Sequence, residues 1–165
     1  MTPPPKQQRR SKRVKQIVSA GIIVFRRTTE GPEFLILYHG RDYWNFPKGR
    51  IESEEKSLTA ALRETKEETG LTADDLRLVE GFKVYERFYF RRLGQPYFKV
   101  VIFYLAETAK SNIRLSKEHR GYGWFLYPEG RKILGKYRDS QAVLKRAYDF
   151  LRAKGMGRRQ PHSPR

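Results

Sequence analysis

The alternation of apolar and polar positions along the chain predicts several β-strands. Runs rich in β-branched and aromatic residues are typical of strands, because such side chains pack well on a pleated surface. These runs occupy residues 17–26, 34–39, 76–90, 97–107 and 123–127. The turn signal Glu30-Gly31-Pro32 predicts a hairpin of the first two runs, and Leu93-Gly94-Gln95-Pro96 separates the third from the fourth. Residues 42–46 lead into a predicted loop, Pro47-Lys48-Gly49.

Two further segments repeat apolar residues at helical spacing. The first has the i, i+3, i+4, i+7 order of a packed helix face, at Leu58, Ala61, Leu62 and Thr65. The second spans residues 139–154 and has an imperfect stripe made of Ala142, Leu144, Ala147, Tyr148 and Leu151. Strands alternating with two helices predict an α/β fold, with a mixed β-sheet between helices.

The ends of the first helix carry capping signals. Ser53 is predicted to be the N-cap, with Glu54 and Glu55 in the first turn near the positive end of the helix dipole. Gly70 is predicted to end the helix in the left-handed conformation that glycine adopts at little cost.

Three carboxylates share the opposite face of this helix. Glu64, Glu67 and Glu68 lie at i, i+3 and i+4, so they project from one side. Like charges at this spacing destabilise a helix by a few tenths of a kcal/mol, unless a cation lies among them. Oxygen ligands in a chain without Cys favour Mg²⁺ or Mn²⁺, and Mg²⁺ commonly completes its shell with substrate phosphates. The pattern predicts a divalent-metal site for a phosphate-bearing substrate.

An arginine beside these carboxylates has a predicted structural role. Arg63 could pair with Glu55 and pin the loop at 47–49 against the helix, although a solvated arginine is the alternative. The loop would then bring the bare backbone of Gly49 to the metal.

Residues 49–71, GRIESEEKSLTAALRETKEETGL, resemble the Nudix box of hydrolases that cleave a nucleoside diphosphate linked to another moiety. The resemblance implies the Nudix α/β/α sandwich and structural roles for Glu55, Arg63 and Gly70. It implies metal contacts from Gly49, Glu64, Glu67 and Glu68. Thr65 occupies a position that is usually aliphatic, a change that affects packing more than chemistry.

Phrases outside the box are similar to the asymmetrical diadenosine tetraphosphate hydrolase branch of that family, over roughly residues 17–150. They are Gly21-Ile22-Ile23-Val24-Phe25-Arg26, Tyr43-Trp44-Asn45-Phe46-Pro47-Lys48-Gly49, Glu80-Gly81-Phe82-Lys83 and Leu115-Ser116-Lys117-Glu118-His119. The branch splits its dinucleotide into ATP and AMP by attack of water on phosphorus. The resemblance implies phosphate contacts for Lys48 and Lys83, and a further metal or base role for Glu118.

The candidate catalytic residues are therefore Glu64, Glu67 and Glu118. A carboxylate near the metals can accept the proton of the attacking water, and Glu64 and Glu118 are the two alternatives for that role. For Glu118 a solvated loop residue is the structural alternative.

Aromatic residues gather between positions 82 and 90 and are candidates for stacking on adenine. Tyr85 or Phe88 is predicted to contact the base, with Tyr122 as a second ring further along the chain. Packing is the alternative, because alternation buries half of such a strand. The segment is longer than in animal-type members and carries Arg87 and a pair of arginines at 91–92.

Charge is the unusual part of the composition, with a formal net charge of +17. Residues 1–16 and 155–165 are basic, lack acidic residues and have little to bury, so both are predicted to be disordered tails around a catalytic domain at 17–154. Such tails could hold RNA or another polyanion electrostatically. Two alternatives to dinucleotide hydrolysis stay open: a decapping-type RNA 5′-end pyrophosphohydrolase, and an RNA-binding Nudix module with weak activity.

Several other classes are excluded or disfavoured by the sequence. No apolar run is long enough to span a membrane, and no secretory leader pattern is present, so a cytoplasmic location and a monomer are expected. His39, His119 and His162 lack the spacing of a metal site, and hydrogen-bonding roles at the surface are predicted for them.

Overall fold

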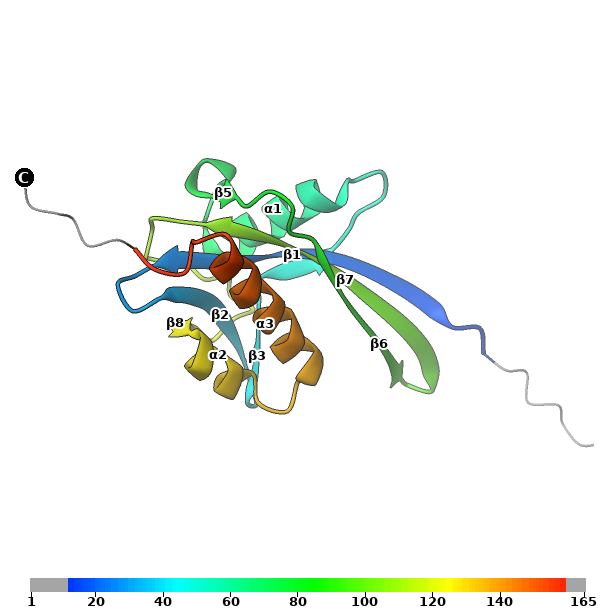
Figure 1. Ribbon diagram of the computed structural model, residues 1–165. Coiled ribbons are helices and arrows are strands. Elements are labelled where there is room, and N and C mark those ends of the chain that lie inside the picture. Colours follow the sequence, from blue (N-terminus) through cyan, green and yellow to red (C-terminus); the bar gives the residue numbers. More distant parts are fainter. Residues whose placement is uncertain (1–11, 160–165) are drawn as a thin grey trace, which may run out of the picture.

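The computed structural model describes residues 12–159 and has a mixed sheet with helices on both of its faces (Figure 1). The strands are β1 (Lys15–Arg27), β2 (Pro32–Gly40), β3 (Tyr43–Asn45), β4 (Lys48–Arg50), β5 (Arg77–Leu78), β6 (Val84–Arg92), β7 (Gln95–Glu107) and β8 (Gly121–Leu126). The helices are α1 (Ser57–Thr69), α2 (Tyr127–Leu134) and α3 (Arg138–Ala153), with a short 3₁₀ turn, η1, at Ala73–Asp75. The predicted α/β fold is confirmed.

The sheet is organised around the pair β1 and β7. These strands run parallel, with residues paired from Lys15 and Tyr97 to Phe25 and Glu107. All other pairs among the described strands are antiparallel, and the main path follows the order β3-β2-β1-β7-β5. The predicted hairpin of β1 and β2 is confirmed by the pairing of Phe25 with Phe34. In addition, β4 pairs with β1, β6 with β7 and β8 with β2.

Two apolar cores lie on opposite faces of the sheet. Beneath α1, the buried residues are Ala20, Ile22, Val24, Leu35, Leu37, Ala60, Ala61, Leu71 and Ala106. Beneath α2 and α3, the core includes Ile23, Phe25, Phe34, Ile36, Phe46, Phe82, Val84, Val101, Phe103, Leu105, Leu134, Val143, Leu144, Ala147 and Leu151. Successive residues of β1 alternate between the two cores, because neighbouring side chains of a strand point to opposite faces.

Helix α1 begins later than predicted. The N-cap is Lys56, without a side-chain cap hydrogen bond, so the prediction of Ser53 as N-cap was wrong. Residues 52–55 form a turn instead, in which Glu54 has a φ of 65° and the Glu55 N–H donates to the Glu52 carbonyl at 3.1 Å. Glu54 and Glu55 therefore precede the first helical turn. At the other end, Gly70 has a φ of 75° and its N–H donates to the Lys66 carbonyl, as predicted.

Three other features differ from the sequence-based expectation. The predicted loop at 47–49 is largely strand β4, because Lys48 and Gly49 pair with β1. The run at 76–90 is divided into β5 and β6 by a turn in which Gly81 has a φ of 83°. Helix α2 was not predicted; its sequence, YPEGRKIL, has a proline in its first turn and a glycine in its middle.

The boundaries of the chain's ends also differ in detail. Strand β1 starts at Lys15, two residues within the predicted basic tail at 1–16. At the other end the Met156 N–H donates to the Leu151 carbonyl at 2.8 Å, and the Arg159 N–H to the Thr28 carbonyl at 2.9 Å. Residues 1–11 and 160–165 of the predicted tails lie outside the described residues. None of the helices at 12–159 has the length and apolar character needed to cross a bilayer.

Candidate functional site

The predicted carboxylates lie on α1, but in different surroundings. The side chains of Glu64 and Glu68 are 16% and 12% exposed, while that of Glu67 is 58% exposed. Packing of the opposite helix face against β1 and β7 fixes this orientation, since Ala61 and Thr65 are fully buried there. The predicted helix face is thus present, with two sheltered carboxylates and one in solvent.

Gly49 faces Glu64 across a contact that only glycine permits. Pairing of β4 with β1 sets Gly49 opposite Ala20. A Cβ added to Gly49 would lie 1.9 Å from Cδ of Glu64, far below any normal contact. The backbone of β4 therefore approaches the Glu64 carboxylate directly, and the metal contact of Gly49 stays a prediction.

Arg63 ties α1 to the turn before it, as predicted. Its Nε and Nη2 donate to Oε1 and Oε2 of Glu55 at 2.8 and 3.0 Å, and Nη2 also donates to the Arg50 carbonyl at 3.0 Å. This bidentate hydrogen bonding lowers the pKa of Glu55 and raises that of Arg63. Arg63 also donates to Glu64 at 2.9 Å and lies 3.4 Å from Glu67. The guanidinium thus balances the charge of both turn and helix.

Glu68 is the carboxylate most affected by its surroundings. Burial raises its pKa to about 7, against the opposing effect of the Lys48 N–H, which donates to Oε2 at 3.1 Å. The charges of Glu64 and Glu118 raise the pKa further, so Glu118 acts on the same site from its loop. Glu118 itself is exposed.

His119 lies beside Glu68, and the surface position predicted for it was wrong because its side chain is buried, whereas His39 is partly buried. His119 is 7% exposed, its Nε2 lies 3.8 Å from Glu68 Oε1, and its Nδ1 is 2.9 Å from the Ser116 hydroxyl. The His39 ring packs edge-on against it with centroids 4.5 Å apart. Burial is the main reason that the pKa of His39 is lowered to about 4, and burial also lowers the pKa of His119. Both rings are therefore neutral at pH 7. The third predicted surface histidine, His162, lies outside the described residues.

A cavity of about 500 Å³ opens next to these carboxylates, on the α3 side of the sheet. It is lined by Tyr43, Asn45, Lys48, Glu86, Phe88, Lys99, Lys136, Tyr137, Arg138, Asp139 and Ser140. Basic side chains outnumber acidic ones in this lining. Lys48 joins the two regions, because its side chain lines the cavity and its backbone N–H binds Glu68.

The cavity has aromatic walls, and its lining includes two ionisable groups whose pKa values are shifted, Lys99 and Glu86. Phe88 lies on β6 beneath the Lys99 ammonium, 6.0 Å from the ring centre, and Tyr137 packs against Tyr43 with centroids 5.0 Å apart. Burial, and next the charge of Lys48, lower the pKa of Lys99 to about 8. Burial also raises the pKa of Glu86, which accepts a hydrogen bond from the Ser140 hydroxyl at 3.0 Å. A flat, anionic ligand fits such a lining.

The remaining predicted residues lie elsewhere. Tyr85 and Lys83 project from the other face of the β6 segment, on the α1 side, where the Lys83 ammonium lies 6.0 Å from the Tyr85 ring centre. Tyr122 lies on β8 and is 38% exposed. Of the predicted binding residues, Lys48 and Phe88 line the cavity, whereas Lys83, Tyr85 and Tyr122 do not. Lys99 and Tyr137 were not among the predicted residues, because no local sequence pattern marks either one.

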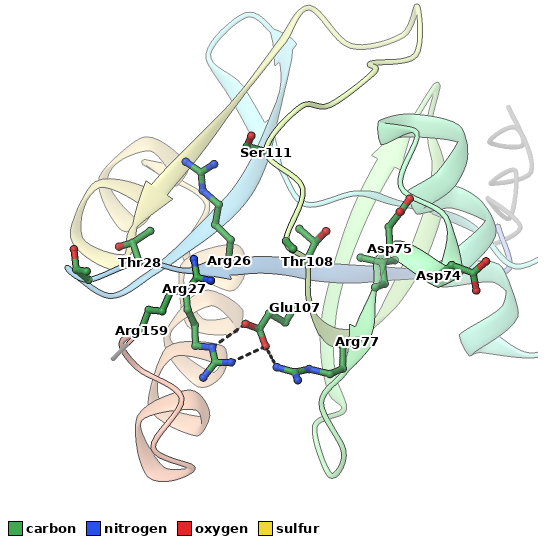
Figure 2. A pocket seen from close by; sticks show the side chains of 13 residues that line it. Arg26, Arg27, Thr28, Asp74, Asp75, Arg77, Glu107, Thr108, Ser111 and Arg159 are labelled. Atoms are coloured by element: carbon green, nitrogen blue, oxygen red, sulfur yellow. Dashed lines mark hydrogen bonds and ion pairs between the residues drawn. The ribbon is translucent and has the colours of Figure 1, made fainter. Parts of the chain in front are cut away.

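A larger cavity of about 740 Å³ lies at the other end of β1 and β7 and holds none of the predicted residues (Figure 2). Its arginines are largely occupied by acidic partners. Arg27 Nε donates to Glu107 at 2.8 Å, Arg77 pairs with the same carboxylate, and Arg26 donates to Glu33 at 2.6 Å. The ion pairs at this cavity join the ends of neighbouring strands.

The donors on α1 suit a hard cation in kind, but Arg63 holds two of them. Within residues 12–159, no three His, Asp or Glu side chains converge as a ready metal cage. Glu64 and Glu67 both face the Arg63 guanidinium, at 2.9 and 3.4 Å. Their oxygens, with the Gly49 backbone alongside, are nonetheless the ligand type that Mg²⁺ and Mn²⁺ prefer.

Comparison with known proteins places this arrangement in a family. A model of the NUDIX domain matches residues 15–146. The chain is 37% identical to the asymmetrical bis(5′-nucleosyl)-tetraphosphatase of Mus musculus and 36% identical to that of Sus scrofa, over 143 residues that cover 81% of this chain and 94% of each relative. A crystal structure of a C. elegans Ap4A hydrolase binary complex matches with a TM-score of 0.73 and 28% identity, covering 83% of this chain and 98% of that one. The chain belongs to the Nudix hydrolase family.

Proposed function

We propose that the protein hydrolyses diadenosine tetraphosphate asymmetrically, to ATP and AMP. The observation that carries the proposal is the junction at Lys48, where a cationic, aromatic-walled cavity meets the carboxylate face of α1. A nucleotide needs both parts, because its base stacks on rings and its phosphates require positive charge. The similarity to asymmetrical tetraphosphatases over most of the chain favours a dinucleoside polyphosphate as the substrate.

A divalent metal is typical of the Nudix family, and the residues that would hold it here are Glu64, Glu67 and Glu68, with the backbone of Gly49. Bound Mg²⁺ or Mn²⁺ would neutralise phosphate charge and stabilise the leaving group. Glu64 and Glu68 are already sheltered from water on α1, so little side-chain freedom remains to be lost there. Arg63 would keep its bidentate hold on Glu55 and so maintain the position of the turn before α1.

The protein's own cations would orient the phosphate chain. Lys48 and Lys99 both line the cavity, and each lies close enough to shift the titration of neighbouring groups. Such partly buried ammonium groups bind phosphate more strongly than solvated ones, because the local dielectric constant is lower. The base would lie between Phe88 on β6 and Tyr137 at the start of α3, where the cavity has its rings.

A carboxylate would accept the proton of the attacking water. Glu64 lies against the β4 backbone, and Glu118 acts electrostatically on Glu68 from the loop before β8. Glu64 and Glu118 belong to the same group of charges, so both remain candidates for the general base. Separate Glu64→Gln and Glu118→Gln variants would distinguish them, because loss of the base lowers turnover without raising the Michaelis constant.

The proposal is tested by product analysis with Mg²⁺ on two substrates, diadenosine tetraphosphate and a triphosphorylated RNA. We expect rapid formation of equal amounts of ATP and AMP from the dinucleotide. Release of pyrophosphate from the RNA at the higher rate would instead support the RNA 5′-end pyrophosphohydrolase. Glu67→Gln serves as the inactive control, and we expect its turnover to fall by orders of magnitude while its circular dichroism spectrum is unchanged.

A further inference from the structure

One face of the β6 segment carries basic and aromatic side chains in alternation. Its members, here called the β6 stripe, are Lys83, Tyr85, Arg87, Tyr89 and Arg91. The intervening residues Val84 and Glu86 are buried on the α3 side, where Glu86 accepts the hydrogen bond of Ser140. Alternation along a strand therefore directs the whole stripe to the opposite face.

The stripe is open to solvent although it contains large rings. Tyr89 is 74% and Tyr85 39% exposed, and the three basic residues between and beside them are exposed as well. Figure 1 shows the far ends of β6 and β7 projecting past the helices, so the outer half of the stripe has no helix above it. Large exposed side chains that gather in one contiguous patch are typical of a binding surface, whereas single exposed rings are not.

Contacts within the stripe hold its rings and cations in place. The Arg87 guanidinium carbon lies 4.8 Å from the Tyr85 ring centre, and the Lys83 ammonium lies 6.0 Å from the centre of the same ring. The Tyr89 ring packs against Phe98 of β7 with centroids 4.6 Å apart. The stripe's partners on β7, which include Phe98, Val100 and Ile102, carry no charge. The surface is therefore positive, with flat apolar faces at regular intervals.

We propose that the β6 stripe binds single-stranded nucleic acid. Unpaired bases would stack on Tyr85 and Tyr89, while Lys83, Arg87 and Arg91 contact the phosphates between them. The stripe spans about 26 Å at the usual rise per strand residue, a length that suits a site of roughly four nucleotides or more. The net charge of +17 adds long-range attraction for the polyanion. A duplex would leave the rings without a function, because its bases are already stacked.

The test measures binding of a fluorescein-labelled single-stranded RNA of mixed sequence to the full-length protein. We expect the double variant Tyr85→Leu/Tyr89→Leu to bind roughly thirtyfold more weakly or worse, since two stacks at about 1 kcal/mol or more each are lost while the charge is unchanged. Tyr122→Leu is the matched control, because it removes another exposed tyrosine, on β8, and should bind as the wild type does. Competition by inorganic polyphosphate, which has no bases, should be equal for the wild type and the double variant.

A second pair of variants tests the cations. We expect Arg87→Gln to lower the slope of log affinity against log salt concentration by about 0.7, the value of one phosphate contact on a single strand. Arg146→Gln removes one charge from the exposed face of α3 and should leave the slope unchanged. Undiminished RNA binding by the tyrosine double variant would overturn the proposal, as would preference for a duplex of the same sequence.

A folding defect is distinguished by the catalytic readout. Tyr89→Leu alone lies at the projecting end of the hairpin, so we expect wild-type hydrolysis of diadenosine tetraphosphate from a variant whose RNA binding is weakened. Failure of the proposed hydrolytic function would leave the binding assays unaffected, and the two proposals stand or fall separately.

Discussion

At the scale of single residues, the site depends on a few positions with no tolerance for another side chain. Gly49 is the clearest, because its backbone touches the Glu64 carboxylate. The position of Glu64, Glu67 and Glu68 on one helix could be predicted from sequence, because spacing alone sets the geometry within a helix. The burial of His119 and the packing of His39 against it could not, because they depend on β2, β3 and the loop before β8.

The first prediction concerns Gly49→Ala. The new Cβ would lie 1.9 Å from Cδ of Glu64, so either β4 or the carboxylate must move. We expect turnover of diadenosine tetraphosphate to fall by about 10²-fold or more, since displacements of about 1 Å have such effects. Gly157→Ala is the control, because its Cβ would meet ordinary contacts at 3.7 Å. Equal activity of the two variants would show that the close approach of β4 is unimportant.

The second prediction concerns the pH dependence of substrate binding. Burial and Lys48 lower the pKa of Lys99 to about 8, so Lys99 is charged below that pH and loses its charge above it. We expect the Michaelis constant to rise as pH increases through about 8 in the wild type, after allowance for the upward shift that a bound anion causes. In Lys99→Arg the charge persists and the rise should disappear. An identical pH profile in both proteins would remove Lys99 from the phosphate site.

At the scale of elements, α3 is attached to β6 through a buried polar contact as well as through apolar packing. The Ser140 hydroxyl donates to Glu86 Oε1, and Glu86 Oε2 has no hydrogen-bond partner among the described residues. Burial raises the pKa of Glu86, so the folded state binds a proton more readily than the unfolded state does. The contribution of Glu86 to stability is therefore greatest at low pH and is lost as pH rises through its raised pKa.

The third prediction follows from this contact. Ser140→Ala removes a donor to a buried carboxylate, and we expect it to lower the free energy of unfolding by about 1–3 kcal/mol at pH 7 and by less at pH 5. Urea unfolding at the two pH values measures both effects. In the background of Glu86→Gln, which carries no charge to lose, the difference between the two pH values should vanish. A loss that is the same at both pH values would mean that Glu86 does not change its protonation state between them.

The limits of sequence-based prediction also show at this scale. The long strands β1 and β7 could be located because their apolar runs are continuous. Helix α2 could not, since a proline and a glycine in an eight-residue segment are typical of a loop. The start of α1 was misplaced because serine is a residue type that commonly caps helices, which made Ser53 the expected N-cap. In the structure, residues 52–55 form a turn that the hydrogen bonds of Arg63 to Glu55 hold against the helix.

At the scale of the whole molecule, the cavity is assembled from segments that are far apart in sequence. Tyr43 comes from β3, Lys48 from β4, Phe88 and Lys99 from β6 and β7, and Tyr137 from the start of α3. No local sequence pattern predicts that these residues converge, because their convergence depends on strand register and on how α3 lies across the sheet. The pairing of Phe88 with Lys99 is one example of a neighbour relationship that only the fold provides.

The fourth prediction separates the cavity from the other candidate rings. We expect Phe88→Ala to raise the Michaelis constant for diadenosine tetraphosphate roughly tenfold, because a stacked base is worth about 1–3 kcal/mol, with turnover changed much less. Steady-state kinetics on Phe88→Ala and Tyr122→Ala provide the comparison. A larger effect at Tyr122 would place the adenine beside β8 rather than in the cavity.

The parallel pair at the centre of the sheet has a consequence for how the molecule is made. Strand β1 is synthesised before its neighbour β7, which lies about eighty residues later in the chain. This thirteen-residue strand, with its apolar middle, must therefore remain with one backbone edge unpaired until β7 has been synthesised. Slow synthesis or truncation before β7 would leave that edge free to pair with another nascent chain, and the cell's demand for chaperones should be greatest in that interval.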